Sequence, residues 1–123
     1  MGARILVIDD DPVVRGMLVD MLQREGYEVV EAEDGRAGMR VFHEQPTALV
    51  ITDVVMPEQE GLETLMQLRQ SATPVKVMAI SGGGRVGPDA YLTSARTLGA
   101  DAILAKTFGR EELLDAVSRL LAT

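Results

Sequence analysis

Apolar runs alternate with amphipathic stretches along the whole of this chain. Three of them, Ile5–Ile8, Leu49–Thr52 and Ala102–Ala105, read as continuous apolar runs, which is typical of strands buried on both faces of a sheet. Val75–Ile80 is a fourth expected strand. Tyr27–Glu31 is a more mixed strand, and its two glutamates indicate an edge position in the sheet.

A helical stripe follows each expected strand. Apolar residues at three- and four-residue spacing follow Pro12, and Gly26 is expected to end that helix. Asp34 can cap the second helix, and Gly99 is expected to end a fourth helix that begins near Pro88. The third and fifth stripes consist of Leu62, Leu65, Met66 and Leu68, and of Leu113, Leu114, Val117, Leu120 and Leu121.

Five strand–helix units with short links predict an α/β fold with a doubly wound parallel sheet. Right-handed crossovers between parallel strands place the helices on both faces of such a sheet. With 123 residues and 46% hydrophobic content, the chain is expected to form one compact domain over residues 1–123.

Composition narrows the classes of function. The chain has no cysteine, so disulfides and thiolate metal sites are excluded, and a reducing compartment fits. No apolar stretch approaches the roughly 20 residues of a membrane span, so we expect a cytoplasmic protein with no membrane partner. The net charge is −7, with 19 acidic and 12 basic residues, which argues against direct binding of nucleic acid.

Polar side chains stand at the ends of four expected strands. Asp9-Asp10-Asp11 follows the first apolar run and Asp53 follows the third strand, while Ser81 and Lys106 follow the fourth and fifth. The carboxyl edge of an open parallel sheet is where binding sites form, so these groups are expected to meet there. Carboxylates, a hydroxyl and an ammonium group together suit a divalent cation and a phosphoryl group.

Each of these groups also has a simpler interpretation. Asp11 precedes Pro12 and is best explained as a helix N-cap. Asp9 and Asp10 would repel each other at a strand end unless a cation such as Mg²⁺, which prefers oxygen ligands, neutralises them. Asp53 could be an ordinary loop residue or a nucleophile that forms an acyl phosphate. Lys106 ends an apolar run, where an unpaired ammonium group would be costly, so we expect it to pair with the carboxylates.

The whole chain resembles the receiver domain of two-component response regulators. The matching residues are Ile5-Leu6-Val7-Ile8-Asp9-Asp10-Asp11-Pro12, Asp53-Val54-Val55-Met56-Pro57 with Gly61, Ser81, and Lys106 with Phe108. The resemblance implies a flavodoxin-like sheet of strand order 2-1-3-4-5 with five helices, an order that the patterning alone does not establish.

The resemblance also implies a role for each site residue. Asp53 would be the phosphoacceptor, Ser81 the hydroxyl that binds the phosphoryl group, and Lys106 its counter-ion. Mg²⁺ would be bound by Asp10, Asp53 and the backbone carbonyl of Val55, with Asp9 acting through water.

Two positions depart from the family pattern. The family usually has proline after the lysine, often in a cis peptide bond, whereas this chain has Thr107. We therefore expect either a trans Lys106–Thr107 bond with a shifted lysine, or a cis bond that costs about 3–4 kcal/mol. Ile103 stands where an aromatic switch residue is common, so we expect the glycine-rich loop after Ser81 to rearrange instead.

The function implied is a phosphorylation switch rather than a turnover enzyme, with only self-phosphorylation and self-dephosphorylation activity. A sensor histidine kinase, a phosphotransfer protein or a small phosphodonor would supply the phosphoryl group. An unknown downstream protein would bind the surface formed by the fourth helix, the strand Ala102–Ala105 and the last helix.

Three other functions are compatible with parts of this pattern. An interaction module that works without phosphorylation is the main one, because Thr107 and Ile103 both depart from the pattern. A Mg²⁺-dependent phosphohydrolase would need a second acid where Val55 stands. A nucleotide-binding flavodoxin-like protein would not place three aspartates against a phosphate.

Overall fold

The computed structural model describes residues 2–53, 60–81, 93 and 95–122. Strands and helices alternate within these residues, as the sequence predicts. The strands are β1 (Arg4–Ile8), β2 (Glu28–Ala32), β3 (Leu49–Asp53), β4 (Lys76–Ser81) and β5 (Ala102–Ala105). The helices are α1 (Pro12–Arg24), α2 (Gly35–Glu44), α3 (Glu60–Gln70) and α5 (Arg110–Ala122).

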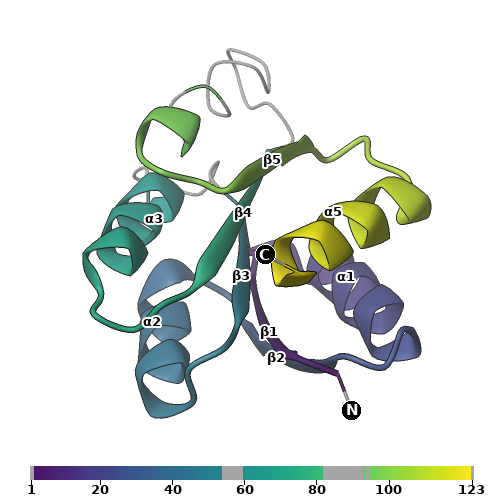
Figure 1. The fold of residues 1–123 in the computed structure, drawn as a ribbon, viewed down its shortest axis with the longest axis horizontal. Helices are drawn as coiled ribbons and strands as arrows, with labels where there is room; N and C mark the ends of the chain where they lie inside the picture. The colour runs from purple at the N-terminus through teal and green to yellow at the C-terminus, as the bar shows by residue number, and fades with distance from the viewer. Residues whose placement is uncertain (1, 54–59, 82–92, 94, 123) are drawn as a thin grey trace.

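The five strands form one parallel sheet in the order β2-β1-β3-β4-β5 (Figure 1). This order confirms the flavodoxin-like fold that the resemblance implies. Strand β1 lies inside the sheet. Strand β2 forms the edge on one side of β1, and β3, β4 and β5 follow in order on the other side. Strands β1 and β3 are neighbours across this change of direction, which is where ligands bind in open α/β sheets.

The helices cover both faces of the sheet, α2 and α3 on one face and α1 and α5 on the other (Figure 1). Side chains of β1 alternate between the two layers, since successive residues of a strand point to opposite faces. Leu6 and Ile8 belong to the hydrophobic cluster that includes residues of α2 and α3, whereas Ile5 and Val7 belong to the cluster with residues of α1 and α5. Both layers of the core are therefore anchored on the strand that leads to Asp9.

The fourth expected helix lies largely outside the described residues. Thr93 and residues 95–97 are helical, and Ala95 is fully buried in the cluster on the α2–α3 face. Gly99 follows with a φ of +106°, a left-handed conformation that favours glycine, and so ends this segment as the sequence predicts. The prediction that it starts near Pro88 falls on residues that are not described.

Helix ends follow the predicted signals. Asp34 is the N-cap of α2, and its side chain accepts a hydrogen bond from the backbone N–H of Ala37 at 2.8 Å. Gly26 has a φ of +91° just after α1, which lets the chain turn sharply back into β2. The predicted boundaries of these two helices are therefore set by local chemistry.

One prediction about burial is wrong. The run Ala102–Ala105 is apolar and was expected to be a buried strand, but all four residues of β5 are only half-buried. The reason is its position, because β5 forms one edge of the sheet and has a neighbour only in β4. At the opposite edge, Glu28 and Glu31 of β2 are exposed, which confirms the edge position predicted for that strand.

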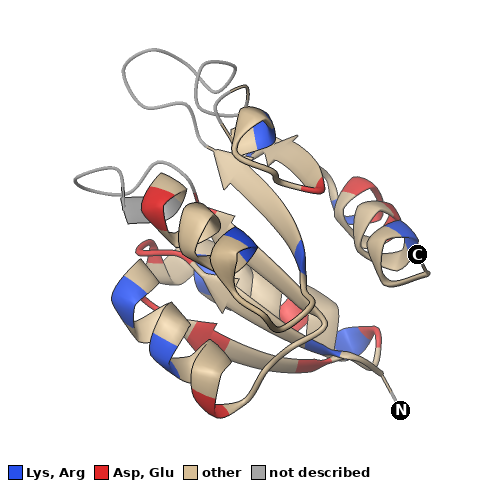
Figure 2. Ribbon diagram, turned by 60° about the vertical axis from the view of Figure 1, so that its left-hand side comes forward, with Lys and Arg blue, Asp and Glu red and all other residues tan. Residues whose placement is uncertain are grey.

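Charged residues lie mainly on the helices and at the ends of strands (Figure 2). The middle of each central strand is apolar and fully buried, from Leu6 in β1 to Met78 in β4. Among the described residues, no helix is both long enough and apolar enough to cross a membrane.

Candidate functional site

Asp9 is held at the end of β1 by both its backbone and its side chain. Its backbone N–H donates to the carbonyl of Ala32 at 3.2 Å, which extends the pairing of β1 with β2 by one residue. Its Oδ1 accepts a hydrogen bond from the N–H of Asp11 at 2.9 Å. The side chain is fully buried, so a carboxylate stands at the edge of an apolar core.

Asp11 caps helix α1, as the sequence predicts. Its Oδ1 accepts from the N–H groups of Val13 at 2.9 Å and Val14 at 3.4 Å, with Pro12 at the first helical position. The carboxylate of Asp11 is thus engaged by the helix end. That leaves Asp9 and Asp10 as the two members of the acidic run that are available for other chemistry.

Asp53 stands beside Asp9 because of the register between β1 and β3. Ile8 pairs with Thr52, so the residues that follow them, Asp9 and Asp53, lie at the same level of the sheet. Only 2% of Asp53 is exposed. Two carboxylates are therefore buried side by side, a costly arrangement unless a positive charge is near.

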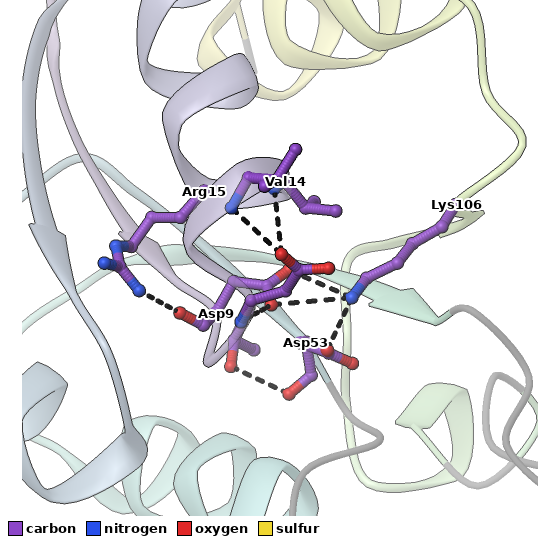
Figure 3. A network of polar contacts seen from close by, with 8 residues as sticks. Asp9, Val14, Arg15, Asp53 and Lys106 are labelled. Atoms are coloured by element: carbon purple, nitrogen blue, oxygen red, sulfur yellow. Dashed lines mark hydrogen bonds and ion pairs between the residues drawn. The ribbon is translucent and has the colours of Figure 1, made fainter.

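Lys106 supplies that positive charge. Its Nζ lies 2.7 Å from Oδ2 of Asp53 and 3.1 Å from Oδ2 of Asp9 (Figure 3). Burial alone would lower the pKa of Lys106, but the hydrogen bond and charge of Asp53, together with Asp9, outweigh burial and raise the pKa above its ordinary value of 10.5. Lys106 is therefore an ammonium ion at any pH near neutrality.

Lys106 reaches the acids although Thr107 replaces the usual proline. No peptide bond among the described residues is cis, so the Lys106–Thr107 bond is trans, which is one of the two alternatives predicted. The backbone N–H of Lys106 donates to the carbonyl of Ser81 at 2.9 Å. This bond places the lysine at the carboxyl edge without a proline.

Ser81 is the last residue of β4 and is fully buried. It pairs with Ala105, while the preceding Ile80 pairs with Asp53. The hydroxyl therefore belongs to the same edge as the carboxylates and Lys106. Val55 and the glycines after Ser81 lie outside the described residues, so the predictions for the Val55 carbonyl and for the loop stay predictions.

Ile103 lies in the middle of β5 and is half-buried. It packs against the hydrophobic cluster on the face of the sheet that α2 and α3 cover. An aliphatic side chain fills this position, as expected from the sequence, so the described structure offers no aromatic ring there to swing between two positions.

The acidic groups are close enough to share one cation. One carboxylate oxygen from each of Asp9, Asp10 and Asp53 lies within 4.8 Å of the other two. Among the described residues none donates a hydrogen bond to the buried Oδ2 of Asp9, which is balanced only by the ion pair with Lys106. Three carboxylates and one ammonium group leave an excess of negative charge, and hard oxygen ligands in this number fit Mg²⁺, which keeps several waters. The residues present therefore fit the metal that the resemblance implies.

One residue near the site was missed by the sequence analysis. Arg15, in the second turn of α1, donates from Nη1 to the backbone carbonyl of Asp9 at 2.7 Å (Figure 3). Its Nε lies 3.0 Å from Oε1 of Glu31 in β2. The only signal in the sequence is a basic residue one turn into the helix that follows the acidic run, and many such residues are solvated.

A cavity of about 460 Å³ lies elsewhere, at the amino edge of the sheet. It is lined by residues of the segment between α3 and β4, by Asp101 and by the end of α5. Arg69 and Asp101 form an ion pair there at 3.4 Å. None of the predicted site residues lines this cavity, so cavity size does not locate the site; the convergence of charges at the carboxyl edge does.

Comparison with known proteins agrees with the fold. Residues 5–118 match the family model of the response regulator receiver domain. The chain is 31% identical to the chemotaxis protein CheY of Bacillus subtilis (strain 168), over 98% of this chain and 99% of that protein. It is 36% identical to the response regulator MprA of Mycolicibacterium vanbaalenii, over 98% of this chain but only 51% of that protein.

A solved structure agrees equally well. The response regulator receiver domain protein (CheY-like) from Methanospirillum hungatei JF-1 superposes with a TM-score of 0.88. It is 25% identical in sequence, and the match covers 99% of this chain and 95% of that one.

Proposed function

Because the chain belongs to the family of response regulator receiver domains, we propose that Asp53 accepts a phosphoryl group and that this changes which proteins the domain binds. Receiver domains of two-component systems are signalling switches rather than turnover enzymes. The observation that carries the proposal is the convergence of Asp9, Asp10, Asp53 and Lys106 at one edge of the sheet.

The proposed chemistry is phosphoryl transfer to a carboxylate. An oxygen of Asp53 attacks the phosphorus, an acyl phosphate bond forms, and the bond from phosphorus to the donor's leaving atom breaks. On dephosphorylation water attacks the phosphorus and Asp53 leaves as a carboxylate, with inorganic phosphate released. Asp10, Asp53 and the carbonyl of Val55 would hold Mg²⁺, with Asp9 acting through water, and the ion would supply charge neutralisation at the phosphoryl oxygens.

Lys106 and Ser81 have complementary proposed roles. In the unphosphorylated state the ammonium group of Lys106 stabilises the Asp53 carboxylate, as their 2.7 Å contact indicates. After transfer the added negative charge lies on the phosphoryl oxygens, so Lys106 moves to them as a counter-ion and the Ser81 hydroxyl donates a hydrogen bond to one of them. The two side chains would thereby pull the ends of β4 and β5 toward Asp53.

The proposed output surface is formed by the fourth helix predicted from the sequence, β5 and α5. Both Ser81 and Lys106 are joined directly to this region, since Lys106 follows β5 and its N–H bonds to the Ser81 carbonyl. Receiver domains act with histidine kinases and downstream effectors. We propose a sensor histidine kinase or phosphotransfer protein as donor, a downstream protein as the partner, and no direct contact with nucleic acid or membrane.

Two further expectations belong to the proposal. We propose that residues 1–123 constitute one receiver domain, and a cytoplasmic location stays a prediction. The phosphorylation-independent module is the weaker alternative, because Lys106 reaches Asp53 and Asp9 with Thr107 in place of proline, which removes one of the two reasons for it.

The test is the intact mass of the protein after incubation with a small phosphodonor, with and without Mg²⁺. We expect the mass of one phosphoryl group to be added to the wild-type protein only when Mg²⁺ is present, and nothing to be added to Asp53→Asn. Asp20→Asn is the matched control, because Asp20 is an exposed carboxylate paired with Arg24 on the outside of α1. Phosphorylation of Asp53→Asn to the wild-type level would refute Asp53 as the acceptor.

A further inference from the structure

The side chain of Arg15 joins three parts of the molecule. It extends from α1, donates a hydrogen bond to the backbone carbonyl of Asp9 just after β1, and pairs with Glu31 of β2. Only 18% of the side chain is exposed, although it lies one turn from a helix end. Two donors of the planar guanidinium group are engaged in different directions, so its orientation is fixed in a way that a single ammonium group cannot reproduce.

The carbonyl that Arg15 contacts belongs to the peptide group between Asp9 and Asp10. Fixing this carbonyl fixes the plane of the peptide, which includes the N and Cα atoms of Asp10, and so restricts the position from which the Asp10 side chain starts. The hydrogen bond is charge-assisted and short, at 2.7 Å, which makes it one of the stronger contacts of the acidic segment.

Asp10 depends on its backbone more than its neighbours do. Asp9 is buried and paired with Lys106, and the Asp11 side chain is engaged by the start of α1. Asp10 is exposed, and within the described part of the chain its carboxylate has neither a hydrogen bond nor an ion pair. Among the described residues, its place within 4.8 Å of the other two acids is therefore supported by its backbone, which includes the peptide that Arg15 holds.

We propose that Arg15 is a positioning residue that aims Asp10 at the cation site, and that Glu31 in turn orients Arg15. This inference rests on the proposed function, since it takes Mg²⁺ as the ion that Asp10 binds. It assigns a role in cation affinity to a residue that contacts neither the phosphoryl group nor the metal.

Electrostatics and positioning predict opposite results when Arg15 is replaced. Loss of a positive charge next to three carboxylates makes the site more attractive to a cation, so electrostatics alone predicts tighter binding of Mg²⁺ in Arg15→Gln. Loss of the hydrogen bond frees the Asp9–Asp10 peptide, so positioning predicts weaker binding. Removing a group that supports a metal ligand typically lowers affinity by about 10- to 100-fold, and we expect roughly tenfold here because Asp10 is supported through its backbone.

The experiment is calorimetric titration of the metal-free protein with Mg²⁺ at constant ionic strength. The variants are Asp10→Asn, Arg15→Gln, Arg15→Lys and Glu31→Gln. The matched control is Arg24→Gln, which removes a charge from the exposed side of the same helix. We expect the Kd for Mg²⁺ to rise most in Arg15→Gln, less in Arg15→Lys and least in Glu31→Gln, with Arg24→Gln like the wild type. Unfolding curves recorded without Mg²⁺ show that each variant is folded.

The outcomes separate this inference from the proposed function. If the wild type binds Mg²⁺, Asp10→Asn does not, and Arg15→Gln binds as tightly as the wild type or more tightly, Arg15 has no positioning role and the metal site stands. If the wild type binds no Mg²⁺, both ideas fail. If Arg15→Gln does not fold, Glu31→Gln decides, because it keeps the arginine and removes only the group that orients it; an unchanged Kd there overturns the proposal.

Discussion

At the scale of single residues, Lys106 determines the charge balance of the site before any cation or phosphoryl group arrives. It faces two buried carboxylates and keeps its proton because their charges outweigh the cost of its own burial. The same ammonium group would compete with a cation for the oxygens of Asp9 and Asp53. We therefore expect Lys106 to stabilise the metal-free domain and to weaken the proposed metal binding at the same time.

Replacing Lys106 with methionine, which is similar in size and uncharged, separates these effects. We expect Lys106→Met to lower the free energy of unfolding by about 1–3 kcal/mol without metal, because removal of one partner leaves the buried acids uncompensated. The expected loss is below that of a fully buried pair because 20% of the lysine side chain is exposed. Mg²⁺ should restore part of the stability and bind more tightly, as denaturant titrations with and without Mg²⁺ would reveal.

The raised pKa of Lys106 makes its contribution depend on pH at the alkaline end. The folded state holds the proton more tightly than the unfolded state, so the contribution is complete below pH 10.5 and disappears as the pH rises through the folded-state pKa. The difference in unfolding free energy between wild type and Lys106→Met should be constant from pH 7 to about pH 10 and shrink above that. If this difference in unfolding free energy stays the same at high pH, the pKa of Lys106 is not raised in the folded state.

Residue-level prediction from the sequence worked where position along a strand determines position in space. Asp53 and Ser81 are the last residues of their strands, and Asp9 and Lys106 directly follow theirs. A parallel sheet therefore brings these four residues to the same edge. Arg15 was missed because its role depends on how α1 is placed against β2. The sequence alone allows either a cis or a trans Lys106–Thr107 bond, since packing decides between them.

At the scale of elements, the contact between α2 and β1 is set by a glycine. A Cβ added at Gly38 would lie 2.4 Å from Cδ1 and 2.8 Å from Cγ1 of Ile8, which is fully buried. Ile8 directly precedes Asp9. The close approach of α2 therefore helps to set the position of the end of β1, which directly precedes Asp9.

Gly38→Ala is expected to destabilise the protein despite the higher helix propensity of alanine. Overpacking against a β-branched side chain costs about 1–3 kcal/mol, whereas the propensity gain is at most about 1 kcal/mol. Gly16→Ala is the matched control, because nothing lies within 4 Å of a Cβ at this exposed position of α1, and it should stabilise by about 0.5–1 kcal/mol. Thermal or denaturant unfolding of both variants would measure the contrast.

A second substitution checks the cause of that effect. Ile8→Val removes the Cδ1 atom with the shortest contact, so it should be less damaging in the Gly38→Ala background than in the wild type. If the losses of stability from the two substitutions are strictly additive, the added methyl group of Gly38→Ala does not act through Ile8.

Element-level prediction succeeded for the type and order of elements and failed for the burial of β5. Hydrophobic periodicity and glycine signals located the described strands and helices to within a few residues. Alternating strands and helices implied a parallel sheet, but strand order determines which strand is an edge, and the order came from the family resemblance. An apolar run such as Ala102–Ala105 has the same sequence pattern in an edge strand, which has one neighbouring strand, as in a central strand, which has two.

At the scale of the whole molecule, Mg²⁺ is expected to raise stability by mass action, since the acidic cluster is assembled only in the folded state. At a free concentration 100 times the Kd the gain is about 2.7 kcal/mol. Asp10→Asn should lose most of this gain. Because the net charge is −7, any salt relieves some repulsion, so NaCl of equal ionic strength is the control. Equal midpoints of thermal unfolding in MgCl₂ and in that NaCl would contradict a specific site.

The ion pairs of Lys106 also have a consequence for synthesis of the chain. Lys106 is 97 residues from Asp9 and 53 residues from Asp53 along the sequence. During translation both aspartates emerge from the ribosome well before the lysine that balances them. A nascent chain that ends at β4 would hold the acids without their internal cation, so the charge balance of the site is completed only when β5 joins the sheet.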